Sequence, residues 1–386
     1  MKVLYITTFY DKYGGAEVLI RETLEYFSIK NTVDVISVMP SSEVLSPNTT
    51  YNIDVEQTIS FILDHVNREN YDLIHIFLGH SLLLKIAIEL KKRGAKVLFH
   101  IIDAWFTFSY FKTKLDPLVD KDFFKIRDKF PESQVFKSFL TLSRTESEME
   151  VISKDIQLNK FADIVLCCSR DVRKYIIKYH SASPKGVKLV PLYNRLNNSS
   201  KQKISANRIN NIAYVGRISD SWKGFTTFLK ATRYKDKALY VFDNTPNLHN
   251  YFSAFENYLK IDALKINIVN NVVDDAKIEA MEKIAMVVIP SIAEGFSFVM
   301  AEAMSLGKLV IVGAKFGGPK DVIKNGVNGF IFKPGDSKSL SDTIDKIDHL
   351  DMKCIRKISN NAVKTASRYS KKRYLMSLDK IYRELI

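Results

Sequence analysis

The chain has 386 residues, more than one hydrophobic core usually serves, so its length alone favours two domains. Hydrophobic residues make up 46% and charged residues 26%, as in ordinary globular proteins, which argues against long disordered segments. The formal net charge is +14, concentrated in residues 201–386. A basic protein can bind three kinds of anionic partner: lipid headgroups, an acidic polymer or nucleic acid. Solvated lysines that only keep the protein soluble explain the charge equally well.

Nothing in the sequence indicates a membrane span or a disulfide framework. The amino terminus, MKVLYITTFY, has only a short apolar run, too brief for a signal peptide or a spanning helix. The most apolar helical stretch, residues 82–90, is interrupted by Lys85 and Glu89. Three cysteines are too few for a disulfide framework or a zinc site, which fits a reducing, cytoplasmic compartment: Cys167, Cys168 and Cys354.

The first half alternates short β-branched runs with amphipathic stretches, a pattern that predicts βαβ units and a parallel sheet. Gly14 and Gly15 follow the first run, and apolar residues then recur at helical spacing from Ala16 to Phe27. This region therefore predicts a strand, a glycine loop and a helix. The predicted strands of this half are Val3–Thr7, Val33–Val38, Leu73–Phe77, Val97–Ile102 and Ile164–Cys168.

The stretch over residues 106–160 is charged, aromatic and less regular, and it predicts helices that wall a cleft. Asp120 and Asp122 form an isolated Asp-x-Asp there. Such a pair can hold a metal ion, but beside Lys121 and Lys125 it indicates a solvated helix surface.

A polar, Ser/Asn-rich stretch over residues 194–210 has the composition of an interdomain linker. A second alternating set of strands and helices begins directly after it, which predicts a second doubly wound domain. Its predicted strands are Ile212–Gly216, Ala238–Phe242, Ile266–Asn270, Met286–Pro290 and Leu309–Val312, and its predicted helices are Phe225–Thr232, Ala276–Ile284 and Ser297–Ser305.

The segment PSIAEGFSFVMAEAMSLG, residues 290–307, carries the strongest functional pattern. A strand ends at Pro290, the chain turns at Gly295 and a helix opens near Ser297. The backbone N–H groups of Phe296–Val299 are then expected at the carboxyl end of the sheet, where α/β folds bind anions.

Two glutamates flank this predicted anion site. Glu294 precedes the helix and Glu302 lies in its second turn. A carboxylate beside a phosphate is costly unless hydroxyl groups donate to it, and a nucleotide sugar offers such hydroxyls on its ribose and its hexose. A buried, satisfied helix residue is the alternative explanation for Glu302.

Two cations stand near the same strand-end face. In VGRISDSWKG, residues 215–224, Arg217 follows a strand and Lys223 precedes a helix. Departure of a nucleoside diphosphate develops negative charge on its phosphate, which fixed cations stabilise more in the transition state than in the ground state. Taken singly, each would be an ordinary surface residue.

A third segment, residues 316–336, is rich in glycine and predicts tight turns around a short strand. Gly317 and Gly318 allow a close backbone approach to a ligand, whereas Gly326 and Gly329 have the positions of purely structural glycines.

Together these segments resemble the carboxyl-terminal half of glycosyltransferase family 4. Glu294 and Glu302 have the spacing of the family's Glu, seven residues, Glu signature. In the first half, Gly14-Gly15-Ala16-Glu17 resembles the family's glycine loop. Ala162–Arg170 resembles the family's strand that ends in a serine, and Val190–Asn194 resembles its run into the linker. Arg368–Ile386 resembles its terminal helix.

The resemblance implies the GT-B fold, an α/β architecture of two Rossmann-like doubly wound domains that face each other across a cleft. It places the acceptor-side domain at residues 1–195, with a returning helix at 369–386 that crosses back to it. The donor-binding domain is placed at residues 205–368. It also implies transfer with retention of anomeric configuration, without a metal or another cofactor.

The resemblance also implies a role for each matched residue. Glu302 would bind the donor ribose, Glu294 the donor sugar, and Arg217 and Lys223 the diphosphate. Asp103 is expected to help place the sugar or the acceptor. The predicted catalytic residues are Arg217, Lys223, Glu294 and Asp103. The predicted donor-binding set is Gly14, Gly15, Arg217, Lys223, Glu294, Gly295, Phe296, Ser297, Phe298, Val299 and Glu302.

Two departures from the family stand out. The chain has Ile102-Asp103 where the family often has His-Asp, with His100 displaced by two positions. It also has the run FDNTP, residues 242–246, where a Gly-x-Gly-Pro turn is common.

The predicted function is transfer of a sugar from a nucleotide sugar, with a UDP-sugar favoured, to a cell-envelope glycan or lipid-linked acceptor. A peripheral position at the inner face of the membrane would suit the basic residues Lys371, Lys372 and Arg373. The alternatives are a nucleotide-sugar epimerase of the same fold, an inactive partner subunit and a nucleic-acid-modifying glucosyltransferase.

Overall fold

A computed structural model describes residues 1–8, 15–38, 55–78, 81–102, 118–127, 157–179, 182–196, 210–243, 248–260, 266–270, 274–313 and 315–386. The contacts divide the chain into two compact units. The first unit comprises Met1–Phe111, Glu132–Leu192 and Lys372–Ile386, and the second Lys112–Pro131 and Tyr193–Lys371. Each unit is an α/β layer structure around a parallel sheet, which confirms the predicted fold class.

The first unit is built on a 6-stranded sheet in the order β2-β1-β3-β4-β5-β6, and every pairing in it is parallel. Its central strands are continuous apolar runs because helices cover both faces of a parallel sheet. The strands are β1 Lys2–Thr7, β2 Thr32–Ser37, β3 Leu73–Leu78, β4 Val97–Ile101, β5 Ile164–Cys167 and β6 Val187–Leu189. The helices are α1 Gly15–Ser28, α2 Val55–Glu69, α3 Ser81–Lys92, η2 Leu158–Lys160, α8 Arg170–Tyr179 and α16 Lys371–Leu385.

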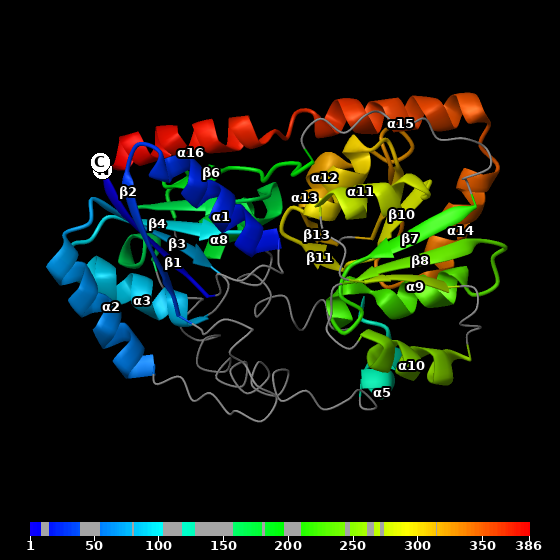
Figure 1. The fold of residues 1–386 in the computed structure, drawn as a ribbon, viewed down its shortest axis with the longest axis horizontal. Coiled ribbons are helices and arrows are strands. Elements are labelled where there is room, and N and C mark those ends of the chain that lie inside the picture. The colour runs from blue at the N-terminus through cyan, green and yellow to red at the C-terminus, as the bar shows by residue number, and fades with distance from the viewer. Residues whose placement is uncertain are drawn as a thin grey trace. The chain divides into compact units, whose positions relative to one another are not determined.

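The carboxyl-terminal helix α16 is part of the first unit's core, although 307 residues separate its Tyr382 from the contacting His75. The Tyr382 hydroxyl lies 2.6 Å from His75 Nδ1 and donates to the hydroxyl of Tyr5 at 3.0 Å. All three side chains are buried. The helix therefore returns to the sheet whose first strand begins the chain (Figure 1).

The second unit has a 6-stranded parallel sheet in the order β14-β12-β10-β7-β8-β9. The chain starts in the middle at β7, runs outward to β8 and β9, and returns to the other side of β7 at β10. The order of strands therefore reverses between β7 and β10. In open α/β sheets ligands bind outside the carboxyl ends of the strands at this topological switch point.

The second unit's strands are β7 Asn211–Val215, β8 Ala238–Asp243, β9 Ile266–Asn270, β10 Met286–Ile289, β12 Leu309–Val312 and β14 Phe330–Ile331, with a small separate pair of β11 Ala293–Glu294 and β13 Phe316–Gly317. Its helices are α5 Lys121–Arg127, η4 Ser221–Lys223, α9 Phe225–Thr232, α10 Leu248–Leu259, α11 Asp274–Glu282, α12 Phe298–Ser305, α13 Gly318–Val322, α14 Ser337–Asp348 and α15 Met352–Ala366.

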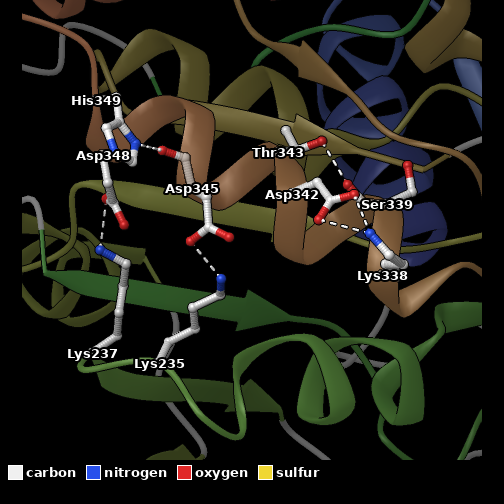
Figure 2. A network of polar contacts seen from close by, with 9 residues as sticks. All are labelled: Lys235, Lys237, Lys338, Ser339, Asp342, Thr343, Asp345, Asp348 and His349. Atoms are coloured by element: carbon white, nitrogen blue, oxygen red, sulfur yellow. Dashed lines mark hydrogen bonds and ion pairs between the residues drawn. The ribbon is translucent and has the colours of Figure 1, made fainter.

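Ion pairs hold α14 near the amino ends of the strands, at the opposite end of the sheet from the switch point. Lys237, immediately before β8, pairs with Asp348 at 2.8 Å, and Lys235 pairs with Asp345 at 2.5 Å (Figure 2). These ion pairs therefore lie at the amino ends of the strands, away from the carboxyl ends where a ligand is expected.

A short segment from the first half of the sequence docks on the second unit. Lys230 of α9 pairs with Asp120 at 2.8 Å and with Asp122 at 2.6 Å, and the Tyr258 hydroxyl of α10 donates to Asp122. Helix α5 lies beside α10 in Figure 1, with Phe123 packed on Phe255. The prediction of a solvated Asp-x-Asp is therefore wrong, because these carboxylates are half-buried or buried partners of a lysine.

The rest of the stretch predicted to wall a cleft falls mostly outside the described residues, as does most of the predicted linker. Of the helices that the structure describes, none has the length and apolar character needed to cross a membrane.

Candidate active site

Two loops meet at the switch point of the second unit. The first follows β7 and includes η4, and the second follows β10. The N–H of Ile292 in the second loop donates to the carbonyl oxygen of Trp222 in the first at 2.9 Å. Gly224 has φ of +67°, and a Cβ there would lie 2.4 Å from the Pro290 carbonyl oxygen. The glycine is therefore required for the two loops to come this close.

Lys223 and Glu294 form the ion pair that joins the two loops. The Lys223 ammonium donates to Glu294 Oε1 at 2.7 Å. Their side chains are 28% and 12% exposed, so the pair is largely withdrawn from water but still reachable. The structure thus brings together two of the predicted catalytic residues, 71 positions apart in the sequence.

The position of Glu294 is fixed by the two-stranded β11–β13 pair, in which it stands opposite Gly317. A Cβ on Gly317 would lie 1.5 Å from the Glu294 carbonyl oxygen, and the residue has φ of +103°. Both values demand glycine. The structure therefore explains Gly317 by the approach of its backbone to the loop that carries Glu294, whereas the predicted approach to a ligand stays a prediction.

Arg217 projects into solvent, with 67% of its side chain exposed and Asp220 at 3.6 Å. Beneath it the buried Tyr214 donates to the Arg217 carbonyl oxygen at 3.1 Å. Burial raises the pKa of Tyr214 well above its usual range, and the carboxylates of Asp243, Asp220 and Glu294 raise it further. Arg217 therefore lies in the same loop as Lys223, with its guanidinium largely exposed to solvent.

Helix α12 opens at this site with a strained cap. Ser297 has φ of +76°, a conformation that costs a non-glycine residue about 1–3 kcal/mol. Its hydroxyl caps the N–H of Met300 at 3.4 Å. The first N–H groups of a helix have no acceptor within it, so those of Phe298 and Val299 can serve an anion. Gly295, Phe296 and Ser297 are buried just before them.

Glu302 lies in the second turn of α12 and belongs to a separate charge cluster. It is almost fully buried, and both its oxygens are bound: Oε1 by Arg195 at 2.5–2.7 Å and Oε2 by Lys277 at 2.7 Å. Burial alone would raise its pKa, but Lys277 and Arg195 lower the pKa to about 2. Glu302 is therefore a permanently charged, immobilised carboxylate.

Not all predicted site residues can be placed. Gly14 and Asp103 lie outside the described residues, while Gly15 is the first residue of α1 in the first unit. His100, the displaced family histidine, is buried in β4 and stacks on His75 with ring centroids 5.4 Å apart. Its ring is part of the first unit's core.

Sequence reasoning missed four residues that shape the site. Arg195 and Lys277 hold Glu302 from 107 and 25 positions away. Asp220 caps η4 through the Trp222 N–H, and Asp243 accepts the Ile218 N–H at 2.7 Å. Asp243 lies in the run that replaces the family's glycine turn, and this departure from the family pattern is the one sequence feature that could have indicated its role. No sequence feature indicates the roles of Arg195, Lys277 and Asp220.

Comparison with known proteins finds a family match in the second half of the chain. Residues 197–365 match the family model for glycosyl transferases group 1. The match covers less than half of the chain. Over 108 residues the chain is also 35% identical to a sucrose synthase of Melioribacter roseus, a match that covers 26% of this chain and 14% of that enzyme. The chain thus spans only about a seventh of that relative.

Solved structures show the fold of the whole chain. A sucrose-phosphate synthase from Thermosynechococcus elongatus superposes with a TM-score of 0.74 at 15% identity, covering 100% of this chain and 99% of that one. HepE of Anabaena, solved in complex with UDP-glucose, superposes with a TM-score of 0.67 at 17% identity and 100% coverage of both chains. The two units therefore have the GT-B fold.

Proposed function

We propose that this protein is a retaining, metal-independent glycosyltransferase of family 4 that uses a nucleotide sugar. The observation that carries the proposal is the Lys223–Glu294 pair, which sits beside the opening of α12 at the switch point of a group 1 domain. A cation, a carboxylate and helix N–H groups at one strand-end edge suit a diphosphate joined to a sugar.

The cations supply the electrostatic part of catalysis in this proposal. Lys223 turns from Glu294 to the leaving diphosphate, and the exposed Arg217 folds over it. The N–H groups of Phe298 and Val299 add a preorganised contribution. These interactions strengthen as the departing phosphate gains charge, so they lower the barrier rather than only tighten binding.

The reaction itself needs one bond exchange at the anomeric carbon. The bond between that carbon and the leaving phosphate oxygen breaks, and the acceptor oxygen bonds to the same face, which retains the configuration. The acceptor's proton passes to the departing phosphate oxygen, giving the nucleoside diphosphate. Glu294, released by Lys223, accepts hydrogen bonds from the sugar hydroxyls and holds the ring in place.

A UDP-sugar is the favoured donor, because HepE was solved with UDP-glucose and UDP. The acceptor that we propose is a cell-envelope glycan or a lipid-linked sugar, reached at an anionic membrane surface. The residues Lys371, Lys372 and Arg373 at the start of α16 suit such a surface electrostatically.

The test uses the full chain with a panel of UDP-, GDP- and ADP-sugars. Release of nucleoside diphosphate, insensitive to a chelator, is the expected result, and NMR of any glycoside product should show the donor's anomeric configuration. Conversion of the donor to an isomeric sugar would instead identify an epimerase. If no donor binds or turns over, the chain is an accessory subunit and the proposal fails.

A further inference from the structure

The charge cluster around Glu302 presents its cations to a ligand rather than its carboxylate. The Glu302 side chain is 2% exposed, whereas those of Lys277 and Arg195 are 16% and 22% exposed. A molecule that reaches this cluster therefore meets the ammonium and the guanidinium before the carboxylate. This inverts the simple expectation that Glu302 alone receives the hydroxyls of a nucleotide.

The hydrogen-bonding capacity of Glu302 is nearly used up. A carboxylate has about four acceptor positions, two on each oxygen. Arg195 fills Oε1 from both its Nε and a terminal nitrogen, and Lys277 takes one position on Oε2. Among the residues that the structure describes, no other side chain binds the Glu302 carboxylate, so one acceptor position on Oε2 remains. A vicinal diol has two hydroxyls, so Glu302 in this arrangement satisfies only one of them.

Lys277 can donate a hydrogen bond to the second hydroxyl. An ammonium carries three N–H donors, and contacts with the described residues use one of them, to Glu302. Lys277 lies in the first half of α11, the helix that follows β9, and its Nζ stands 2.7 Å from the Oε2 that keeps an acceptor position. An acceptor and a donor therefore lie side by side, as a pair of adjacent hydroxyls requires.

Arg195 keeps this arrangement in place. Its guanidinium lies over the Phe298 ring at 5.1 Å while it binds Oε1. The neighbouring Asn194 donates its backbone N–H to the Tyr369 carbonyl oxygen at 2.8 Å, which anchors that part of the chain. The Arg195 guanidinium is thus held by both Phe298 and Glu302, whereas Lys277 contacts Glu302 only through the ammonium at the end of a flexible side chain.

We propose that Lys277 is a nucleotide-binding residue that donates to a ribose hydroxyl while Glu302 accepts from the other. This rests on the proposed function, since the ligand is the nucleotide part of the donor. Lys277 then determines specificity, because it makes the site select ribonucleotides over nucleotides that lack the ribose diol.

The test compares UDP with 2′,3′-dideoxy-UDP by calorimetric titration of the full chain, with ADP and GDP run alongside. The wild type should bind UDP about tenfold or more tightly than the dideoxy compound, as expected for hydrogen bonds to charged groups. In Lys277→Met this preference should fall several-fold. Lys277→Gln, which keeps an N–H donor, should retain part of it. Melting temperatures verify that both variants are folded.

Lys223→Met is the matched control, because it removes the same charge from the diphosphate end of the site. It should weaken the binding of UDP and of dideoxy-UDP equally, and so leave the preference for UDP over dideoxy-UDP unchanged. If Lys277→Met keeps the wild-type preference or binds UDP more tightly, Lys277 is only a counter-ion of Glu302 and the assignment is overturned. If the wild type binds none of the three nucleotides, the proposed function itself fails, and the assignment falls with it.

Discussion

Replacement of Glu302 by glutamine should destabilise the protein in a pH-dependent way. Its pKa falls from 4.5 to about 2 on folding, because Lys277 and Arg195 outweigh its burial. This difference corresponds to about 3 kcal/mol of stability at neutral pH. Since the pKa is lower in the folded state, the contribution is complete above about pH 5. It is lost as the pH falls from 4.5 towards 2, and about 1 kcal/mol should remain at pH 3.

The assay is urea denaturation of the wild type and Glu302→Gln between pH 7 and pH 3. Fluorescence of Trp222, one of two tryptophans in the chain, reports on the second unit. Asp342→Asn is the control, because its pair with Lys338 is largely exposed and should change stability by less than about 1 kcal/mol. A Glu302→Gln loss under about 1 kcal/mol at pH 7, or an equal loss at pH 3, would refute the ion-pair account.

Three further changes test other parts of the site. Lys223→Met should weaken nucleoside diphosphate binding at least tenfold in calorimetry, whereas Lys338→Met, which changes an exposed side chain of α14, should leave binding unchanged; equal effects would remove Lys223 from the site. Gly317→Ala should lower unfolding free energy by at least about 2 kcal/mol, since its Cβ would overlap the loop of Glu294; a neutral result in denaturation would contradict the close approach. Lys230→Met should speed proteolytic cleavage within residues 118–127 by releasing α5, and an unchanged cleavage pattern would show that its ion pairs do not hold that segment.

Most strands and three helices of the second unit were predicted because each is a local pattern, whereas the longer helices α10, α14 and α15 were not predicted. The helix Phe225–Thr232 and the strands Ile266–Asn270 and Leu309–Val312 have the predicted bounds, and other ends differ by one or two residues. Buried parallel strands read as continuous apolar runs, and glycine or proline marks their ends. The loop after β10, which we propose binds an anion, was predictable for the same reason.

The charge partners could not be predicted, because ion pairs join residues that only the fold brings together. Glu302 was singled out, yet nothing near it in the sequence indicates Arg195 or Lys277. Asp120 and Asp122 were interpreted from their lysine neighbours, while their partner Lys230 is about 110 positions away. Local patterns therefore determine elements, and long-range pairing determines which charges are buried.

We propose that the loops after β7 and β10 bind the diphosphate of a nucleotide sugar. A structure of the full chain soaked with UDP-glucose is the most direct test. We expect a diphosphate within hydrogen-bonding distance of Lys223 Nζ and the Phe298 and Val299 N–H groups, with the Lys223–Glu294 contact broken. A diphosphate bound elsewhere, or a bound donor that leaves that contact intact, would contradict the proposal.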